Sequence, residues 1–178
     1  MTTIGYVVGS LSSTSINRKV IDAIGLNAPE GVQLREIPIK DLPLYSQDHD
    51  ADFPPVARDF KAAIDASDAV VVATPQFNDS FSGVVKNAVD WSSRPWGQHS
   101  FNGKPVAVAS ASVAPHGGAK AADLLAQVLA FGEARVSDGR LSVAVGEDTF
   151  DADGNFADVA LREQARGFVT ALAGSVQN

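Results

Sequence analysis

Strand-like and helix-like segments alternate along the whole chain, and this alternation restricts the possible fold more than any other feature. Short apolar runs predict strands over residues 3–8, 32–37, 68–74, 105–111 and, in two pieces, 133–136 and 140–145. Predicted helices lie over residues 16–24, 55–66, 81–92, 118–131 and 156–173. Five βα units with nearly continuous apolar strands favour a parallel sheet covered on both faces. We therefore expect an α/β, doubly wound five-stranded parallel sheet, with residues 1–178 forming one domain.

Composition excludes several classes of function. The net charge is −7 and the isoelectric point is near 4.8, whereas a nucleic-acid partner would require a basic face. The chain has no cysteine, which excludes disulfides, thiolate metal sites and thiol redox chemistry. No apolar run approaches the ~20 residues of a membrane span. We expect a cytoplasmic protein with no membrane insertion, because no signal peptide is recognisable and cysteine is absent.

Residues 74–91, TPQFNDSFSGVVKNAVDW, are the most informative segment for function. They follow a buried strand, so Thr74 to Asn78 are expected to form a loop at the strand's carboxyl end, before a helix that begins near Ser82-Gly83. Ligands of open α/β sheets bind at the carboxyl ends of strands. A loop stiffened by Pro75, with an aromatic ring and amide groups, suits a flat heterocycle.

Residues 9–17, GSLSSTSIN, connect the first strand to the first helix. Hydroxyl groups, backbone N–H groups and the helix dipole at such a position favour an anion, and a monophosphate in particular. The glycine pattern of dinucleotide-binding loops and the G-x-x-x-x-G-K-[ST] pattern of triphosphate loops are both absent from the sequence. The alternative is that Ser13 and Ser15 only cap the helix.

Residues 110–120, SASVAPHGGAK, follow the fourth strand and would lie at the same edge of the sheet. Their glycines permit a close approach of the backbone to a ligand, although an ordinary βα turn is the alternative. His116 is a candidate acid or base, but no carboxylate stands near it in sequence to orient it. His49 and His99 lie in polar segments and are expected to be solvated. Acidic residues over 148–155 do not fit a calcium loop, and we interpret them as a turn before the last helix.

Together, these three loops resemble those of the NAD(P)H-dependent FMN reductase family, whose members include quinone and chromate reductases. The family's second loop, T-P-E-Y-N-x-S-x-P-G-x-L-K-N-A-I-D-W, is long and specific, and residues 74–91 are similar to it. The first loop, G-S-L-R-x-x-S-x-N, corresponds to residues 9–17, and the third, S-x-G-x-x-G-G-x-R, to residues 112–120. The resemblance covers nearly the whole chain and agrees in the order and spacing of the loops.

The resemblance implies a flavodoxin-like fold, FMN as cofactor, and NADPH or NADH as co-substrate. It implies ping-pong hydride transfer to a small-molecule electron acceptor such as a flavin or quinone. It assigns no catalytic side chain, because the flavin carries the chemistry. It also implies a homodimer or homotetramer, with the helix that contains residues 86–91 at the dimer contact. The implied cofactor-binding residues are Ser10, Ser12, Ser15, Ile16, Asn17, Pro75, Gln76, Phe77, Asn78, Ser112 and His116.

Every loop also departs from the family pattern, which marks a divergent member. The arginine of the first loop is replaced by Ser12, and this removes a charge-assisted phosphate contact. The other replacements are Gln76 for glutamate, Phe77 for tyrosine, Ser82 for proline, Ala114 for glycine and Lys120 for arginine. Two other functions remain open at this point: a non-enzymatic, flavodoxin-like electron carrier, and a branch that has lost FMN.

Overall fold

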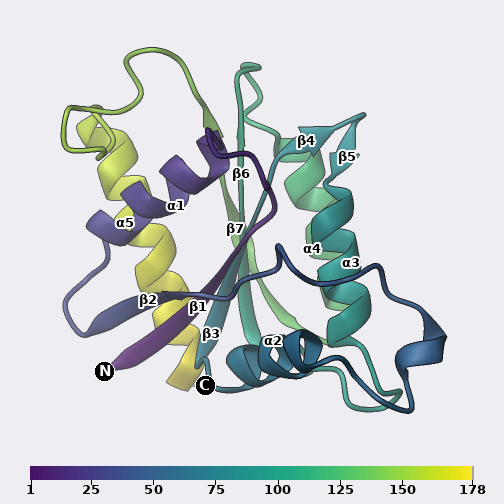
Figure 1. Cartoon of the computed structure of the whole chain (residues 1–178). Coiled ribbons are helices and arrows are strands. Elements are labelled where there is room, and N and C mark those ends of the chain that lie inside the picture. The colour runs from purple at the N-terminus through teal and green to yellow at the C-terminus, as the bar shows by residue number, and fades with distance from the viewer. Residues whose placement is uncertain (178) are drawn as a thin grey trace.

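The computed structural model describes residues 1–177 and contains a five-stranded, fully parallel sheet (Figure 1). In spatial order its strands are β2 (Val32–Glu36), β1 (Thr2–Val8), β3 (Ala69–Thr74), β6 (Pro105–Ser112) and β7 (Arg135–Ala144). The order reverses at β1, which pairs with β2 on one side and with β3 on the other. The predicted fold class is therefore confirmed.

Helices cover both faces of the sheet. One face carries α1 (Ile16–Leu26) and α5 (Val159–Gly174), on the left in Figure 1. The other face carries α2 (Pro55–Asp65), α3 (Gly83–Ser92) and α4 (Ala119–Phe131). Two short 3₁₀ turns, η1 (Gln47–His49) and η2 (Ser175–Gln177), lie outside these layers. None of the helices within residues 1–177 is both long enough and apolar enough to cross a bilayer.

The strands read as continuous apolar runs because both of their faces are buried. In β3, Val70 and Val72 pack against α2–α4, whereas Ala69, Val71 and Ala73 pack against α1 and α5. Successive side chains of a strand point to opposite faces, so each run supplies two cores at once.

The last strand and the last helix differ from their predicted limits. The predicted split at residues 137–139 is a bulge in one continuous strand, since Val106 pairs with Val136 and Val108 with Arg140. The last helix begins at Val159 and not at residue 156. Asp158 is its N-cap, because its side chain accepts a hydrogen bond from the Ala160 amide at 2.8 Å.

Candidate functional site

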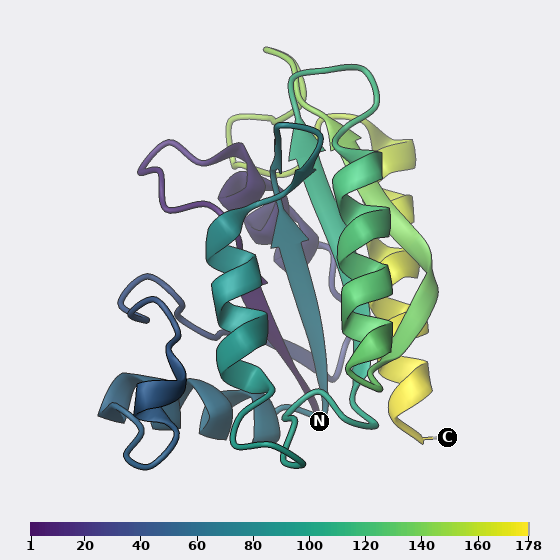
Figure 2. The same cartoon turned by 90° about the vertical axis from the view of Figure 1, so that its right-hand side faces the viewer.

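Three loops meet at the carboxyl edge of the sheet, and these loops with the adjoining ends of α1 and β6 contain all of the predicted cofactor-binding residues. The loops follow β1, β3 and β6, which are neighbours in the sheet, and Figure 2 shows them at one end of the molecule. The chain passes from β1 to the α1 face but from β3 to the α3 face. The first two loops therefore diverge where the strand order reverses, which is the usual ligand position in this architecture.

The first loop surrounds the amino end of α1. Leu11 to Thr14 are exposed, whereas Ser15 is buried and caps the helix by accepting a hydrogen bond from the Arg18 amide at 3.2 Å. The cap is thus Ser15 and not Ser13. The Ser12 hydroxyl accepts a hydrogen bond from the Thr14 amide at 3.2 Å and shapes the turn. Hydroxyl and backbone N–H groups at a helix amino end form a suitable environment for a phosphate.

The cation nearest to this loop in sequence is engaged elsewhere. The Arg18 guanidinium makes two hydrogen bonds to the Glu36 carboxylate on β2, at 3.0 and 2.6 Å. The hydrogen bond with Arg18 is the main reason that the pKa of Glu36 is lowered from its ordinary value. The first loop therefore offers neutral donors and the helix dipole to an anion.

Asn17 joins the first loop to the end of β6. Its side chain is 2% exposed, and its Nδ2 donates to the Ala111 carbonyl at 3.2 Å while its Oδ1 accepts from the Ala111 amide at 3.0 Å. Both ends of the amide group are thus used by the backbone of β6, one residue before the strand ends. The geometry gives Asn17 the role of fixing the distance between two loops.

The second loop is a small β-hairpin, which corrects the expected loop over residues 74–78. The expected helix start near Ser82-Gly83 is confirmed, and the limit at residue 81 lies two residues too early. Strands β4 (Gln76–Phe77) and β5 (Ser80–Phe81) are antiparallel, and α3 begins after the N-cap Ser82. Asn78 and Asp79 have φ angles of 49° and 66°. A two-residue turn with two positive φ angles matches the twist of a hairpin, and asparagine and aspartate adopt it readily. The Asn-Asp pair was the sequence signal for this hairpin.

Buried hydroxyl groups that the sequence analysis did not single out anchor the hairpin and the third loop. The Thr74 hydroxyl accepts a hydrogen bond from the Ser82 amide at 3.1 Å and donates to the Pro75 carbonyl at 2.9 Å. The Ser110 hydroxyl donates to the Gly117 carbonyl at 2.9 Å. Thr74, the last residue of β3, pairs with Ser110 of β6, and this pairing sets the base of both loops.

Side chains of the hairpin point in different directions. Phe77 is 57% exposed, and Pro75 is buried. The Gln76 Oε1 accepts a hydrogen bond from the Ala121 amide at 3.4 Å, and its Nε2 donates to Asp79 at 3.4 Å. Gln76 thus reaches toward the start of α4, while Asn78 lies in the exposed turn.

The third loop turns sharply through two glycines. Gly117 and Gly118 have φ angles of 59° and 82°, and a Cβ on Gly117 would lie 2.7 Å from the backbone of Ser142 and Val143. His116 is exposed, and its Nδ1 accepts a hydrogen bond from the Gly118 amide at 3.1 Å. The Ser112 hydroxyl accepts from the Ala114 amide at 3.1 Å. The loop therefore presents its backbone at the site edge, and the two predicted side chains shape its turns.

Asn87 and Trp91, near the end of the motif over residues 74–91, make structural contacts with the segment that follows β2. Asn87 Nδ2 donates to the Pro43 carbonyl at 2.9 Å, and Asn87 Oδ1 accepts from the Tyr45 amide at 2.9 Å. Trp91 Nε1 also donates to the Pro43 carbonyl, at 2.7 Å, and its ring packs edge-on against Tyr45. These motif residues clamp the long segment after β2 onto α3.

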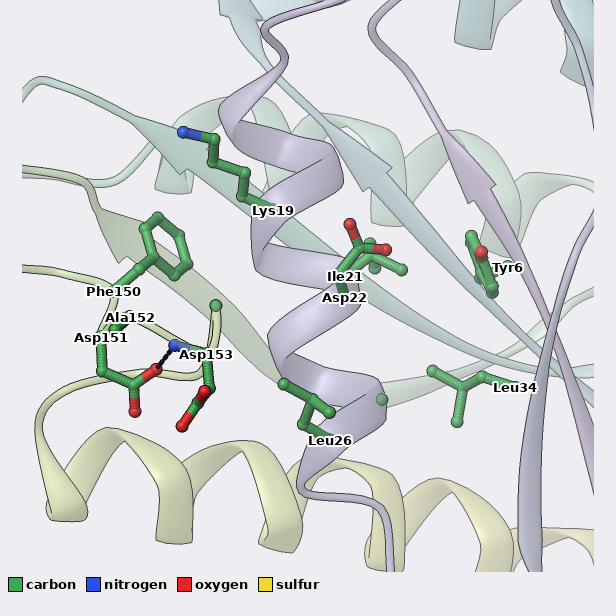
Figure 3. Close-up of a pocket in the computed structure, with 12 residues that line it drawn as sticks. Tyr6, Lys19, Ile21, Asp22, Leu26, Leu34, Phe150, Asp151, Ala152 and Asp153 are labelled. Atoms are coloured by element: carbon green, nitrogen blue, oxygen red, sulfur yellow. Dashed lines mark hydrogen bonds between the residues drawn. The ribbon is translucent and has the colours of Figure 1, made fainter.

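A separate groove of about 640 Å³ lies beside α1 (Figure 3). Residues of β1, β2, α1 and the 150–154 turn line it, and none of the predicted cofactor-binding residues is among them. In the turn, the Asp151 carboxylate accepts hydrogen bonds from the Asp153 and Asn155 amides and from Arg162. This carboxylate organises the turn before α5. We place the candidate site at the three loops, where the strand order reverses.

The groups at the three loops fit FMN. The first loop has the neutral donors and helix amino end that a phosphate monoester requires. The hairpin and the glycine loop follow the next two strands of the sheet, β3 and β6, and so lie beside the first loop. The exposed Phe77 ring supplies an aromatic surface, and Gly117 allows the backbone to turn without a side chain.

Comparisons with known proteins agree with this fit. The family model described as NADPH-dependent FMN reductase matches residues 2–148. A 2-hydroxy-1,4-benzoquinone reductase from a Burkholderia species is 39% identical over 98% of this chain and 96% of its own length. An NAD(P)H-dependent FMN reductase from Pseudomonas aeruginosa is 37% identical over 93% and 90%. The solved structure of FerB, a flavoenzyme NAD(P)H:(acceptor) oxidoreductase from Paracoccus denitrificans, has a TM-score of 0.93 at 33% identity, over 99% of this chain and 98% of that chain.

Proposed function

The chain belongs to the NADPH-dependent FMN reductase family, and from this premise we propose that its three loops hold one FMN within one domain that spans residues 1–178. The protein is an FMN-dependent oxidoreductase that uses NAD(P)H to reduce a flavin, a quinone or a similar small acceptor. The observation that carries the proposal is the meeting of the three loops at the ends of neighbouring strands. Relatives that match nearly the whole chain are named as enzymes, which disfavours an electron carrier or a branch without FMN.

In this proposal, residues of each loop have a distinct task. Ser10, Ser12 and Ser15 with the backbone of Ile16 would hold the phosphate, and Asn17 would fix the first loop against β6. The hairpin from Pro75 to Asn78 would line the ring, and Ser112 and His116 would border its other edge. When bound, FMN would supply two-electron redox chemistry between the nicotinamide and the acceptor. The chain itself then needs only to bind, orient and exclude water.

A direct test follows apoprotein during titration with FMN. Binding should quench flavin fluorescence and raise the melting temperature, because a ligand that binds only the folded state stabilises it. With FMN bound, NADH or NADPH oxidation in the presence of 1,4-benzoquinone should give parallel double-reciprocal lines, since both substrates would use one face of the flavin. Intersecting lines would indicate a separate acceptor site. The absence of any effect of saturating FMN would refute the proposal.

We further propose that the protein acts in the cytoplasm as a homodimer or homotetramer that uses the face formed by α3 and α4. Trp96 and Phe131 are 88% and 92% exposed, and both line a groove of about 560 Å³ between these helices. Exposed aromatic groups beside a groove favour a protein interface. Sedimentation should give more than one protomer, and Trp96→Ser with Phe131→Ser should give a monomer. Leu26→Ser, at an exposed apolar residue of α1, is the matched control.

A further inference from the structure

The tip of the hairpin is tied to α4 by an ion pair between Asp79 and Lys120. We propose that this pair is a positioning device: it holds the β4–β5 hairpin, and with it Phe77, in place for the nicotinamide substrate and the acceptor. The proposal rests on the proposed function, because it concerns a wall of the same site. Neither residue is proposed to touch FMN or the substrate.

The hairpin needs support from outside. Its ladder consists only of the pairs Gln76–Phe81 and Phe77–Ser80, and an isolated two-stranded ribbon is at best marginally stable in water. At its base, the Thr74 hydroxyl accepts from the Ser82 amide. Two further contacts run to the first turn of α4: one from Asp79 in the turn to Lys120, and one from Gln76 in the ladder to the Ala121 amide at 3.4 Å.

Lys120 stands at a position where a cation is unfavourable for its own helix. It is the second residue of α4, close to the positive end of the helix dipole, which favours negative side chains. The Asp79 carboxylate gives this cation a partner and also accepts from Gln76 Nε2 at 3.4 Å. Because Lys120 is unfavourable for α4 itself, the ion pair with the hairpin is the best explanation for a lysine at this position.

The ion pair is also accessible to salt. The two side chains are 59% and 61% exposed, so mobile ions screen their attraction. The hairpin should therefore loosen as ionic strength rises, even in apoprotein. A change of this kind is local and reversible, because the pair bridges two elements at the surface.

Two neutral variants test the proposal. Asp79→Asn removes the charge but keeps a residue that tolerates a positive φ, so the turn is retained. Lys120→Gln removes the cation and also relieves the unfavourable dipole contact, so the melting temperature should be unchanged or higher. Lys120→Arg should restore wild-type behaviour. Asp52→Asn, which breaks an exposed ion pair with Arg58 on α2, is the matched control.

The first readout is amide hydrogen exchange over residues 76–82 in apoprotein. We expect exchange to be about threefold faster in Asp79→Asn and Lys120→Gln than in the wild type at low salt, a size typical of an exposed ion pair. Raising the salt concentration should speed exchange in the wild type until its rate matches that of the two variants. Unchanged exchange in both variants would overturn the proposal. This readout needs no FMN, so it separates failure of the ion-pair proposal from failure of the proposed function.

The second readout is steady-state kinetics with NAD(P)H. Both neutral variants should raise KM by about threefold with little change in kcat, because each loosens the same wall. If the two charges acted directly on the anionic substrate, Lys120→Gln would raise KM and Asp79→Asn would lower it. Shifts of opposite sign, or an unchanged KM in both variants, would therefore contradict a positioning role.

Discussion

At the residue scale, a few buried polar side chains determine how the loops of the site are spaced. Asn17 spans from α1 to β6 through two hydrogen bonds, and Thr74 and Ser110 fix the bases of the other two loops. A buried amide or hydroxyl that loses its partner carries the full cost of desolvation, about 1–3 kcal/mol. These groups therefore hold the site edge in one arrangement before any ligand binds.

The neutral character of the first loop gives the first prediction. Ser12→Arg would add a charge-assisted contact to a phosphate, worth about 1.5–3 kcal/mol against ~1 for a neutral one. Ser12 is exposed, so the longer side chain has room. FMN affinity, measured by fluorescence titration, should rise about fivefold for a net gain of ~1 kcal/mol, and the gain should shrink with salt. Ser12→Gln, which adds length without charge, should not tighten binding; equal effects of both variants would argue against the electrostatic cause.

The tight turn of the third loop gives the second prediction. In Gly117→Ala, the new Cβ would lie 2.7 Å from the backbone of β7, at a φ of 59° that alanine rarely adopts. Relief requires the loop or β7 to move, at a cost of about 1–3 kcal/mol. Urea unfolding should show this loss, and FMN affinity should fall with it. Gly146→Ala adds a Cβ with nothing within 4 Å and should remain within about 0.5 kcal/mol of the wild type.

At the scale of elements, periodicity predicted the strands and helices well, and most limits agree within two residues. Buried parallel strands and amphipathic helices leave strong patterns, because each must satisfy a whole face of the core. The predicted loop over residues 74–78 was wrong because a two-residue strand has no detectable period. Only the turn chemistry of Asn78 and Asp79 marked the hairpin. The predicted split of the fifth strand was wrong because a bulge interrupts the pattern while the pairing continues.

Sequence reasoning could also bring the three loops to one edge, because the carboxyl ends of parallel strands meet there. It could not separate residues that face a ligand from residues that hold the site together. The motif around residues 86–91 illustrates this limit: Asn87 and Trp91 bind a loop that follows β2, at separations of 44 and 48 positions in the chain. Contacts over such a separation leave no local pattern.

The clamp gives the third prediction. Asn87→Ala removes two hydrogen bonds to the backbone of Pro43 and Tyr45. The Tyr45 amide loses this partner, whereas the Pro43 carbonyl still accepts from Trp91 Nε1. The free energy of unfolding should fall by about 1–3 kcal/mol, and proteolysis should begin within residues 38–54. Asn102→Ala, at an exposed asparagine, is the control and should stay close to the wild type. Cleavage that begins elsewhere would indicate that Asn87 does not hold this segment.

At the scale of the whole molecule, two titratable side chains near the amino-terminal edge of the sheet, Lys61 and His99, are partly shielded from solvent. Lys61 of α2 donates to the Ser92 and Gln98 carbonyls at 2.8 and 2.9 Å, and burial lowers its pKa. The His99 ring packs against Gly132 and is half-buried, so the expectation that His99 is solvated is confirmed only in part. Burial, followed by the positive charge of Lys61, lowers the pKa of His99 from its ordinary value of 6.5.

This lowered pKa gives the last prediction, which concerns stability against pH. As pH falls below 6.5, the unfolded chain takes up a proton at residue 99 but the folded chain does not, so the free energy of unfolding decreases until the folded pKa is reached. His99→Asn keeps an acceptor for the Phe101 amide and removes the titration. Between pH 7.5 and 5.5, the melting temperature of the wild type should fall more than that of the variant. The extra fall should be roughly 2–4 °C for each kcal/mol by which protonation lowers the free energy of unfolding. This range lies above the one in which Glu36, whose pKa is lowered, loses its contribution on protonation. Parallel curves for the two proteins would show that His99 is not the group that destabilises the fold in weak acid.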